Sequence, residues 1–67
     1  MKVAQRIKEL RIERRLTQVQ LAKSVGCSQP MVVMWENGKC EPTASAIVKL
    51  AQALNCTTDY LLGVSDL

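Results

Sequence analysis

The feature of this sequence that most constrains its fold is the very short interval between two apolar helical segments, residues 17–25 and residues 28–37. Thr17 opens the first segment, and Gln20 three residues later completes a capping box. Gly26, directly after this segment, suits the left-handed conformation that commonly ends a helix. A turn this short forces the two helices to cross steeply, which is the geometry of a helix-turn-helix unit over about residues 17–38. The small or apolar residues that this crossing requires are Leu21, Ala22, Val25, Val32 and Trp35.

The second of these segments has its own start and stop signals. Ser28 or Gln29 can cap it, and Pro30 is tolerated in a first turn, whose N–H groups have no intrahelical partner. The helix is expected to run to about Asn37, with Gly38 as its stop.

Three further segments carry a helical pattern. Residues 3–15 have an apolar stripe, Thr43 caps a segment that ends at Asn55, and Thr57 caps a short segment that ends at Gly63. Their inward stripes consist of Val3, Ile7, Leu10, Ile47, Leu50, Ala51, Leu54, Leu61 and Leu62. No alternating run is bounded by a hairpin signal. The sequence therefore predicts an all-α, compact five-helix domain that spans residues 1–67 as a single unit.

Composition excludes several classes of protein. The chain has 67 residues with one Trp, one Tyr and no Phe, so its core must be aliphatic. No apolar run approaches the ~18 residues that cross a bilayer, and no leader pattern is present. We therefore expect a cytoplasmic protein with no membrane association.

Catalysis and metal binding are also disfavoured by the residue types present. The three cysteines are Cys27, Cys40 and Cys56, which are odd in number and far apart, and the chain has no His. Zinc sites use closely spaced Cys or His pairs, and His is the commonest general base. No phosphate-binding loop or nucleophile motif replaces it. We expect no enzyme activity, no metal, no cofactor and no small-molecule ligand.

The basic charge is concentrated in the first third of the chain. Residues 1–23 hold seven basic and two acidic residues, a net charge of +5, whereas residues 24–67 hold two basic and four acidic residues, a net charge of −2. This asymmetry fits a polyanionic partner, and it equally fits a solvated helix face.

The stretch TQVQLAKSVGCSQPMVVMWENG, residues 17–38, resembles the helix-turn-helix domains of the lambdoid phage repressors and Cro proteins and the wider Xre-like family. The resemblance continues through RIKELR near the start and ALNCTTDYLLG near the end, so it covers almost the whole chain. It implies a transcriptional repressor of double-stranded DNA that places its third helix in the major groove, usually as a dimer on a near-palindromic operator. Because no second domain follows, a Cro-like repressor is expected.

The resemblance implies base-reading residues near the start of the third helix. Gln29 carries an amide that donates and accepts, which matches adenine N7 and N6. The residue matching Gln18 in the family contacts phosphate and supports the base-reading Gln. Ser28 is first a helix cap and second a contact to phosphate or base. The alternative is that both amides are only solvated.

The apolar run PMVVMW departs from the usual polar pattern of such a helix. Pro30 and Met34 are expected to face the groove, where thymine methyl groups are the natural targets. Met31 and Val33 fit DNA and a protein partner equally well. A protein-interaction module on the same fold, such as an antitoxin or an anti-regulator, is the alternative function.

The resemblance also implies phosphate contacts beyond the third helix. Asn37 and Lys39 lie where family members contact the backbone, and Thr43 caps a helix whose free N–H groups suit phosphate. Arg6, Arg14 and Arg15 could widen a basic rim, but most exposed arginines contact only water, and that is the favoured interpretation for each of them.

Two further expectations concern structure. In similar proteins an Arg and a Glu at the positions of Arg11 and Glu36 form a largely buried ion pair, so we predict a structural role for this pair. In relatives the dimer contact uses the loop before the fourth helix and the start of the fifth, here roughly residues 41–45 and 56–59. Such small patches predict a homodimer that is weak without DNA.

Overall fold

Five helices make up the computed structural model, which describes residues 2–66. They are α1 (Val3–Glu13), α2 (Gln18–Val25), α3 (Gln29–Glu36), α4 (Ala44–Ala53) and α5 (Thr58–Leu62), and no strand occurs among these residues. The prediction of an all-α fold with five helices is confirmed.

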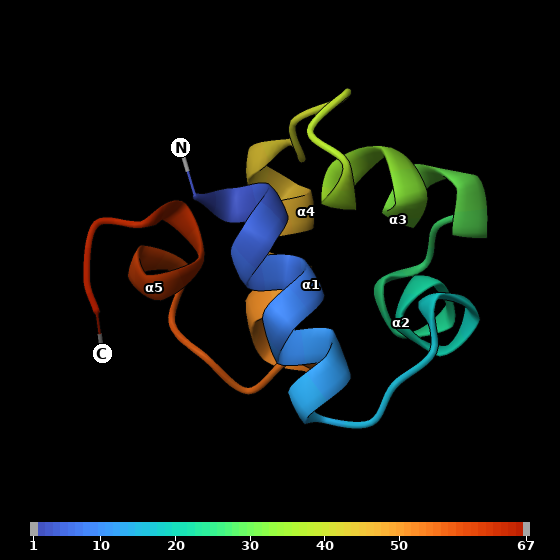
Figure 1. Ribbon diagram of the computed structural model, residues 1–67, viewed down its shortest axis with the longest axis horizontal. Coiled ribbons are helices and arrows are strands. Elements are labelled where there is room, and N and C mark those ends of the chain that lie inside the picture. The colour runs from blue at the N-terminus through green and yellow to red at the C-terminus, as the bar shows by residue number, and fades with distance from the viewer. Residues whose placement is uncertain (1, 67) are drawn as a thin grey trace.

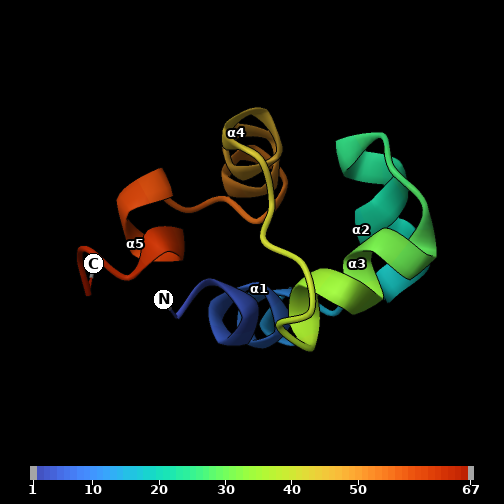
Figure 2. The same cartoon turned by 90° about the horizontal axis from the view of Figure 1, so that it is seen from above.

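The helices divide into two groups around α1. In Figures 1 and 2, α2 and α3 lie at one end of the molecule and α5 lies at the other, with α1 and α4 between them. The first and last described residues both lie at the α5 end, away from α3. The helix-turn-helix unit therefore occupies a part of the surface that the chain ends leave clear.

Local capping chemistry sets the helix boundaries. The hydroxyl groups of Thr17, Thr43 and Thr57 each accept a hydrogen bond from a backbone N–H three residues further on. Asn55 ends the α4 segment in the left-handed conformation, with φ of 54°, as predicted. Helix α1 ends at Glu13, two residues before Arg15, because Arg15 has a left-handed φ of 61° that a helix cannot contain.

One aliphatic core holds the five helices together. The predicted inward stripes are buried except for Leu62, which is half-buried at the edge of the core, and the fully enclosed side chains are Ile7, Leu21, Val32, Leu50, Leu54 and Leu61. The two aromatic residues take different places, since Trp35 is buried in the core and Tyr60 is half-buried at its edge. Across residues 2–66, no helix is long and apolar enough to span a membrane.

Candidate nucleic-acid interface

The turn between α2 and α3 places α3 against α2 and α1. Thr17 and Gln20 form the complete capping box, in which the Thr17 N–H donates to Gln20 Oε1 at 2.8 Å and the Gln20 N–H donates to Thr17 Oγ1 at 3.0 Å. Gly26 adopts φ of 77°, a left-handed value that reverses the chain directly after α2. The predicted helix-turn-helix unit is therefore present, with its local signals in the expected places.

Helix α3 buries one side and leaves its first turn in solvent. Val32 and Trp35 face the core, as predicted, whereas Gln29 and Pro30 are exposed. Met34 is half-buried. The exposed surface of α3 thus combines one amide with apolar groups.

Met31 and Val33, the two residues with open assignments, differ in their surroundings. Both are half-buried, but Met31 packs against the core and lies beside Cys27, Cys40 and Trp35 in the groove between α3 and α4. Part of the Met31 side chain is therefore occupied by the fold and is not available to a partner.

A buried ion pair joins α1 to the end of α3. Arg11 Nε donates to Glu36 Oε2 at 2.7 Å, and Arg11 Nη2 donates to Glu36 Oε1 at 3.1 Å. The two side chains are only 13% and 5% exposed, respectively. Arg11 Nη1 also donates to the carbonyl of Leu16 at 2.9 Å, so the same guanidinium fixes the turn between α1 and α2. This bidentate geometry is the strong form of an Arg–carboxylate pair.

The ion pair extends through two amides to the exposed start of α3. Gln18 Nε2 donates to Glu36 Oε1 at 3.2 Å, and Gln29 Nε2 donates to Gln18 Oε1 at 3.5 Å. The second distance is long for a hydrogen bond. Gln18 is half-buried and Gln29 is exposed, so the chain of contacts runs from the interior to solvent.

Ser28 occupies the N-cap position of α3 in an extended conformation, but its side chain makes no capping hydrogen bond. The expectation that Ser28 acts first as a helix cap is therefore wrong for its hydroxyl group. Pro30 in the first turn lacks an N–H, which removes one of the donors that a cap would satisfy.

The expected phosphate-contacting residues follow α3 and precede α4. Asn37 is the C-cap of α3, and its Oδ1 accepts a hydrogen bond from the Lys39 N–H at 3.0 Å. Both side chains are exposed. Thr43 Oγ1 accepts a hydrogen bond from the Ala46 N–H at 3.2 Å, so Thr43 caps the N-terminus of α4.

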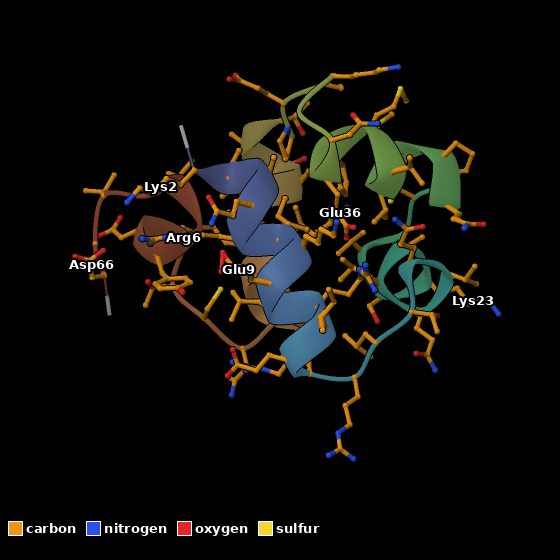
Figure 3. The ribbon with its side chains drawn as sticks, viewed as in Figure 1. Lys2, Arg6, Glu9, Lys23, Glu36 and Asp66 are labelled. Atoms are coloured by element: carbon orange, nitrogen blue, oxygen red, sulfur yellow. The ribbon has the colours of Figure 1, made fainter. Side chains whose placement is uncertain are left out.

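Arg6 does not contribute to a basic rim, and it is not left to contact only water either. Its side chain is buried at 8% exposure, and its guanidinium donates to the Tyr60 carbonyl at 2.6 Å, the Ser65 carbonyl at 2.7 Å and Asp66 Oδ1 at 3.1 Å. It also lies 4.1 Å from the centre of the Tyr60 ring. Figure 3 shows Arg6 and Asp66 together at the α5 end, on the other side of α1 from Glu36.

Arg14 and Arg15 are both exposed, but within residues 2–66 only Arg14 has side-chain partners in the fold. Arg14 Nε donates to the Leu54 carbonyl at 3.1 Å, which ties the end of α1 to the end of α4. Arg15 is exposed. Partners of Arg6 and Arg14 are at least 40 residues away apart from the neighbouring Glu13, so no local signal in the sequence could have identified them.

The cysteines are free thiols at half-buried positions. Burial raises the pKa of Cys27, and burial likewise raises the pKa of Cys56 although the nearby Arg14 charge opposes this shift. Within residues 2–66 no group of three Cys, Asp or Glu side chains lies close enough to hold a metal ion.

Comparison with known proteins places this architecture in a family. The family model described as helix-turn-helix matches residues 7–61, which is most of the chain. The protein belongs to this helix-turn-helix family.

Its relatives include phage repressors. The chain is 35% identical over 60 residues to repressor protein C2 of Salmonella phage P22, and 37% identical over 67 residues to the immunity repressor protein of Bacillus phage phi105. These matches cover 90% and 100% of this chain but only 28% and 46% of the two repressors, so the chain spans less than half of each.

A solved structure of the P22 c2 repressor in complex with a synthetic operator has the same fold. It superposes with a TM-score of 0.85 at 34% identity, over 88% of this chain and 89% of that chain. Each of these relatives is named as a repressor, and none is named as an enzyme.

Proposed function

We propose that this protein is a sequence-specific regulator of transcription, of the Cro or repressor type, that binds double-stranded DNA by placing α3 in the major groove. The observation that carries the proposal is the exposed first turn of α3, where Gln29 contacts Gln18 of α2. Membership of the helix-turn-helix family and similarity to an operator-bound repressor support it. The protein acts by binding and not by catalysis, without a cofactor, in the cytoplasm.

The base-reading surface is the exposed side of α3. Gln29 presents an amide to an adenine, and Pro30 and Met34 present apolar groups to thymine methyl groups. Ser28, whose hydroxyl group is not used as a cap, supplies a further contact at the start of the helix.

The phosphate-contacting residues flank this surface. Gln18 begins α2, where unpaired N–H groups and the helix dipole favour an anion. Lys39 offers a positive charge on a turn that Asn37 shapes through its side-chain hydrogen bond. Thr43 caps the N-terminus of α4, which we propose as a third phosphate-contacting position.

The size of the domain supports two copies on one near-palindromic operator. The longest extent of the protein is 27 Å, whereas major-groove sites one helical turn apart on one face of B-DNA are separated by about 34 Å. One copy therefore covers one half-site. We propose that residues 41–45 and 56–59 form the dimer contact, and that the dimer is weak without DNA.

Selection of duplexes from a random library at about 100 mM salt tests this function, because charge attraction beyond about 10 Å is already screened there. Enrichment of a two-fold symmetric site with half-sites one turn apart is the expected result. A loss of about 10³–10⁵ in affinity between 50 and 200 mM salt is expected if six to ten phosphates are neutralised.

Absence of any enriched site would refute the proposal. The apolar groups of Met31, Val33 and Met34 would then be assigned to a protein partner, as in an antitoxin or an anti-regulator. A Lys2→Ala variant serves as a control for Lys39→Ala, because both variants remove one positive charge. Lys2 lies at the α5 end, away from α3 (Figure 3). The Lys2→Ala variant is expected to select the same site as the unmodified protein.

A further inference from the structure

Glu36, Gln18 and Gln29 form a chain of side-chain hydrogen bonds, which we call the amide chain. The Glu36 carboxylate lies at its buried end, and Gln29 lies at its exposed end on α3. The Glu36 Oε1 atom accepts from both Arg11 Nη2 and Gln18 Nε2, at 3.1 and 3.2 Å. An ionised carboxylate only accepts hydrogen bonds. The Gln18 amide must therefore turn its nitrogen toward Glu36 and its oxygen away from it.

The direction of the Gln18 amide is passed on to Gln29. Because the Gln18 nitrogen faces Glu36, the Gln18 oxygen is the atom that faces Gln29; an amide oxygen only accepts, so the Gln29 nitrogen donates to it. The Gln29 amide then keeps one N–H and its oxygen for a partner. The 3.5 Å length of this contact makes it a directional preference and not a rigid restraint.

We propose that Glu36, held by Arg11, is a positioning residue that makes Gln29 select adenine over guanine. This inference rests on the proposed function. Adenine presents one acceptor and one donor in the major groove, N7 and the N6 amino group, which match one N–H and one oxygen. Guanine presents two acceptors, N7 and O6, and the Gln29 oxygen cannot donate to either of them.

Arg11 is needed for this selectivity because it keeps the carboxylate in one orientation. Its bidentate contact engages both Glu36 oxygens, so the carboxylate cannot rotate away from Gln18. An amide in place of the carboxylate would offer either a donor or an acceptor to Gln18. Both amides could then reverse, and Gln29 could turn two N–H groups toward guanine.

The experiment compares affinities for two duplexes that differ only at the base pair facing Gln29, identified by the library selection and by its loss of preference in Gln29→Ala. The duplexes carry A·T or G·C at that position. The unmodified protein is expected to prefer A·T by about 5- to 150-fold, the range of one bidentate contact. In Glu36→Gln and in Gln18→Met, this ratio is expected to fall below about threefold.

Two controls separate positioning from stability. Arg6→Gln removes a buried guanidinium at the α5 end of the molecule, far from the amide chain, and is expected to keep the full A·T to G·C ratio. In a Gln29→Ala background, Glu36→Gln is expected to change the ratio no further. If Glu36→Gln does not fold, the inference is still refuted by a retained preference in Gln18→Met, because this variant leaves the Arg11–Glu36 pair in place but removes both contacts that link Glu36 to Gln29.

The outcomes distinguish this inference from the proposed function. A protein that binds a selected operator and keeps its A·T preference in Gln18→Met or in folded Glu36→Gln refutes the positioning role and leaves the regulator function standing. A preference for G·C opposite Gln29 in the unmodified protein also overturns the inference. Failure of the unmodified protein to select any duplex refutes the proposed function itself.

Discussion

Removal of Arg11 alone, in an Arg11→Met variant, is expected to lower the free energy of unfolding by about 3–5 kcal/mol, because it leaves a buried charge without its partner. The Glu36 side chain is only 5% exposed and would retain a single donor, Gln18 Nε2 at 3.2 Å. A domain of 67 residues has a total stability of only about 3–10 kcal/mol at typical values per residue. The loss would therefore lower the melting temperature by at least about 12 °C.

Replacement of both partners, in Arg11→Met with Glu36→Leu, is expected to recover most of this loss, because apolar residues of similar volume fit a buried site without a desolvation cost. A deficit of about 1 kcal/mol is expected to remain, since the Leu16 carbonyl loses the hydrogen bond from Arg11 Nη1.

Urea denaturation followed by Trp35 fluorescence measures these changes, since Trp35 is the only tryptophan and is buried next to Glu36. The slope of the transition is expected to be unchanged while its midpoint moves. A single variant within about 1 kcal/mol of the unmodified protein would refute the reasoning. A double variant no more stable than Arg11→Met would refute it as well.

Four other outcomes are expected. Gln29→Ala relaxes preference at one base pair by about 1–3 kcal/mol and leaves the circular dichroism spectrum unchanged; unaltered base preference would remove it from the reading surface. Lys39→Ala weakens binding to all sequences alike and lowers the salt slope by about one, and a sequence-dependent loss would contradict a phosphate contact. Arg6→Gln lowers the free energy of unfolding by about 1.5–3 kcal/mol, the value of a hydrogen bond to a charged group. It also accelerates amide hydrogen exchange in residues 63–66, and exchange as slow as in the unmodified protein would show that the contacts of Arg6 do not hold this segment. In the folded protein at pH 8–9, Cys27 and Cys56 react with iodoacetamide more slowly than in the urea-unfolded protein, because burial raises the pKa of each thiol and the thiolate is the reactive form. Equal rates in the folded and unfolded protein would argue against raised pKa values.

The sequence accounts for the helices because their signals are local. Three threonines cap helices by accepting a hydrogen bond from the backbone N–H three residues further along the chain: Thr17, Thr43 and Thr57. Gly26 adopts its positive φ without help from any distant residue. Ser28 shows the limit of this reasoning, since a residue suited to capping occupies the N-cap and its side chain makes no cap bond.

For the candidate site, the resemblance to phage repressors predicts the roles of Gln18 and Gln29 and the pairing of Arg11 with Glu36, whereas residue spacing alone does not. The sequence does not predict the hydrogen bond from Gln18 to Glu36, because this bond joins the start of α2 to the end of α3 across 18 residues.

By itself, then, the sequence determined the all-α architecture, the steep turn at Gly26 and the apolar faces that pack, since these depend on hydrogen bonds and sterics within a few residues. Only the tertiary structure decided which charges are surface charges. Arg6 lies in the basic third of the chain, yet carbonyl groups 54 and 59 residues away enclose it. Such contacts exist only after packing has brought α1 against α5, and no pattern around Arg6 encodes them.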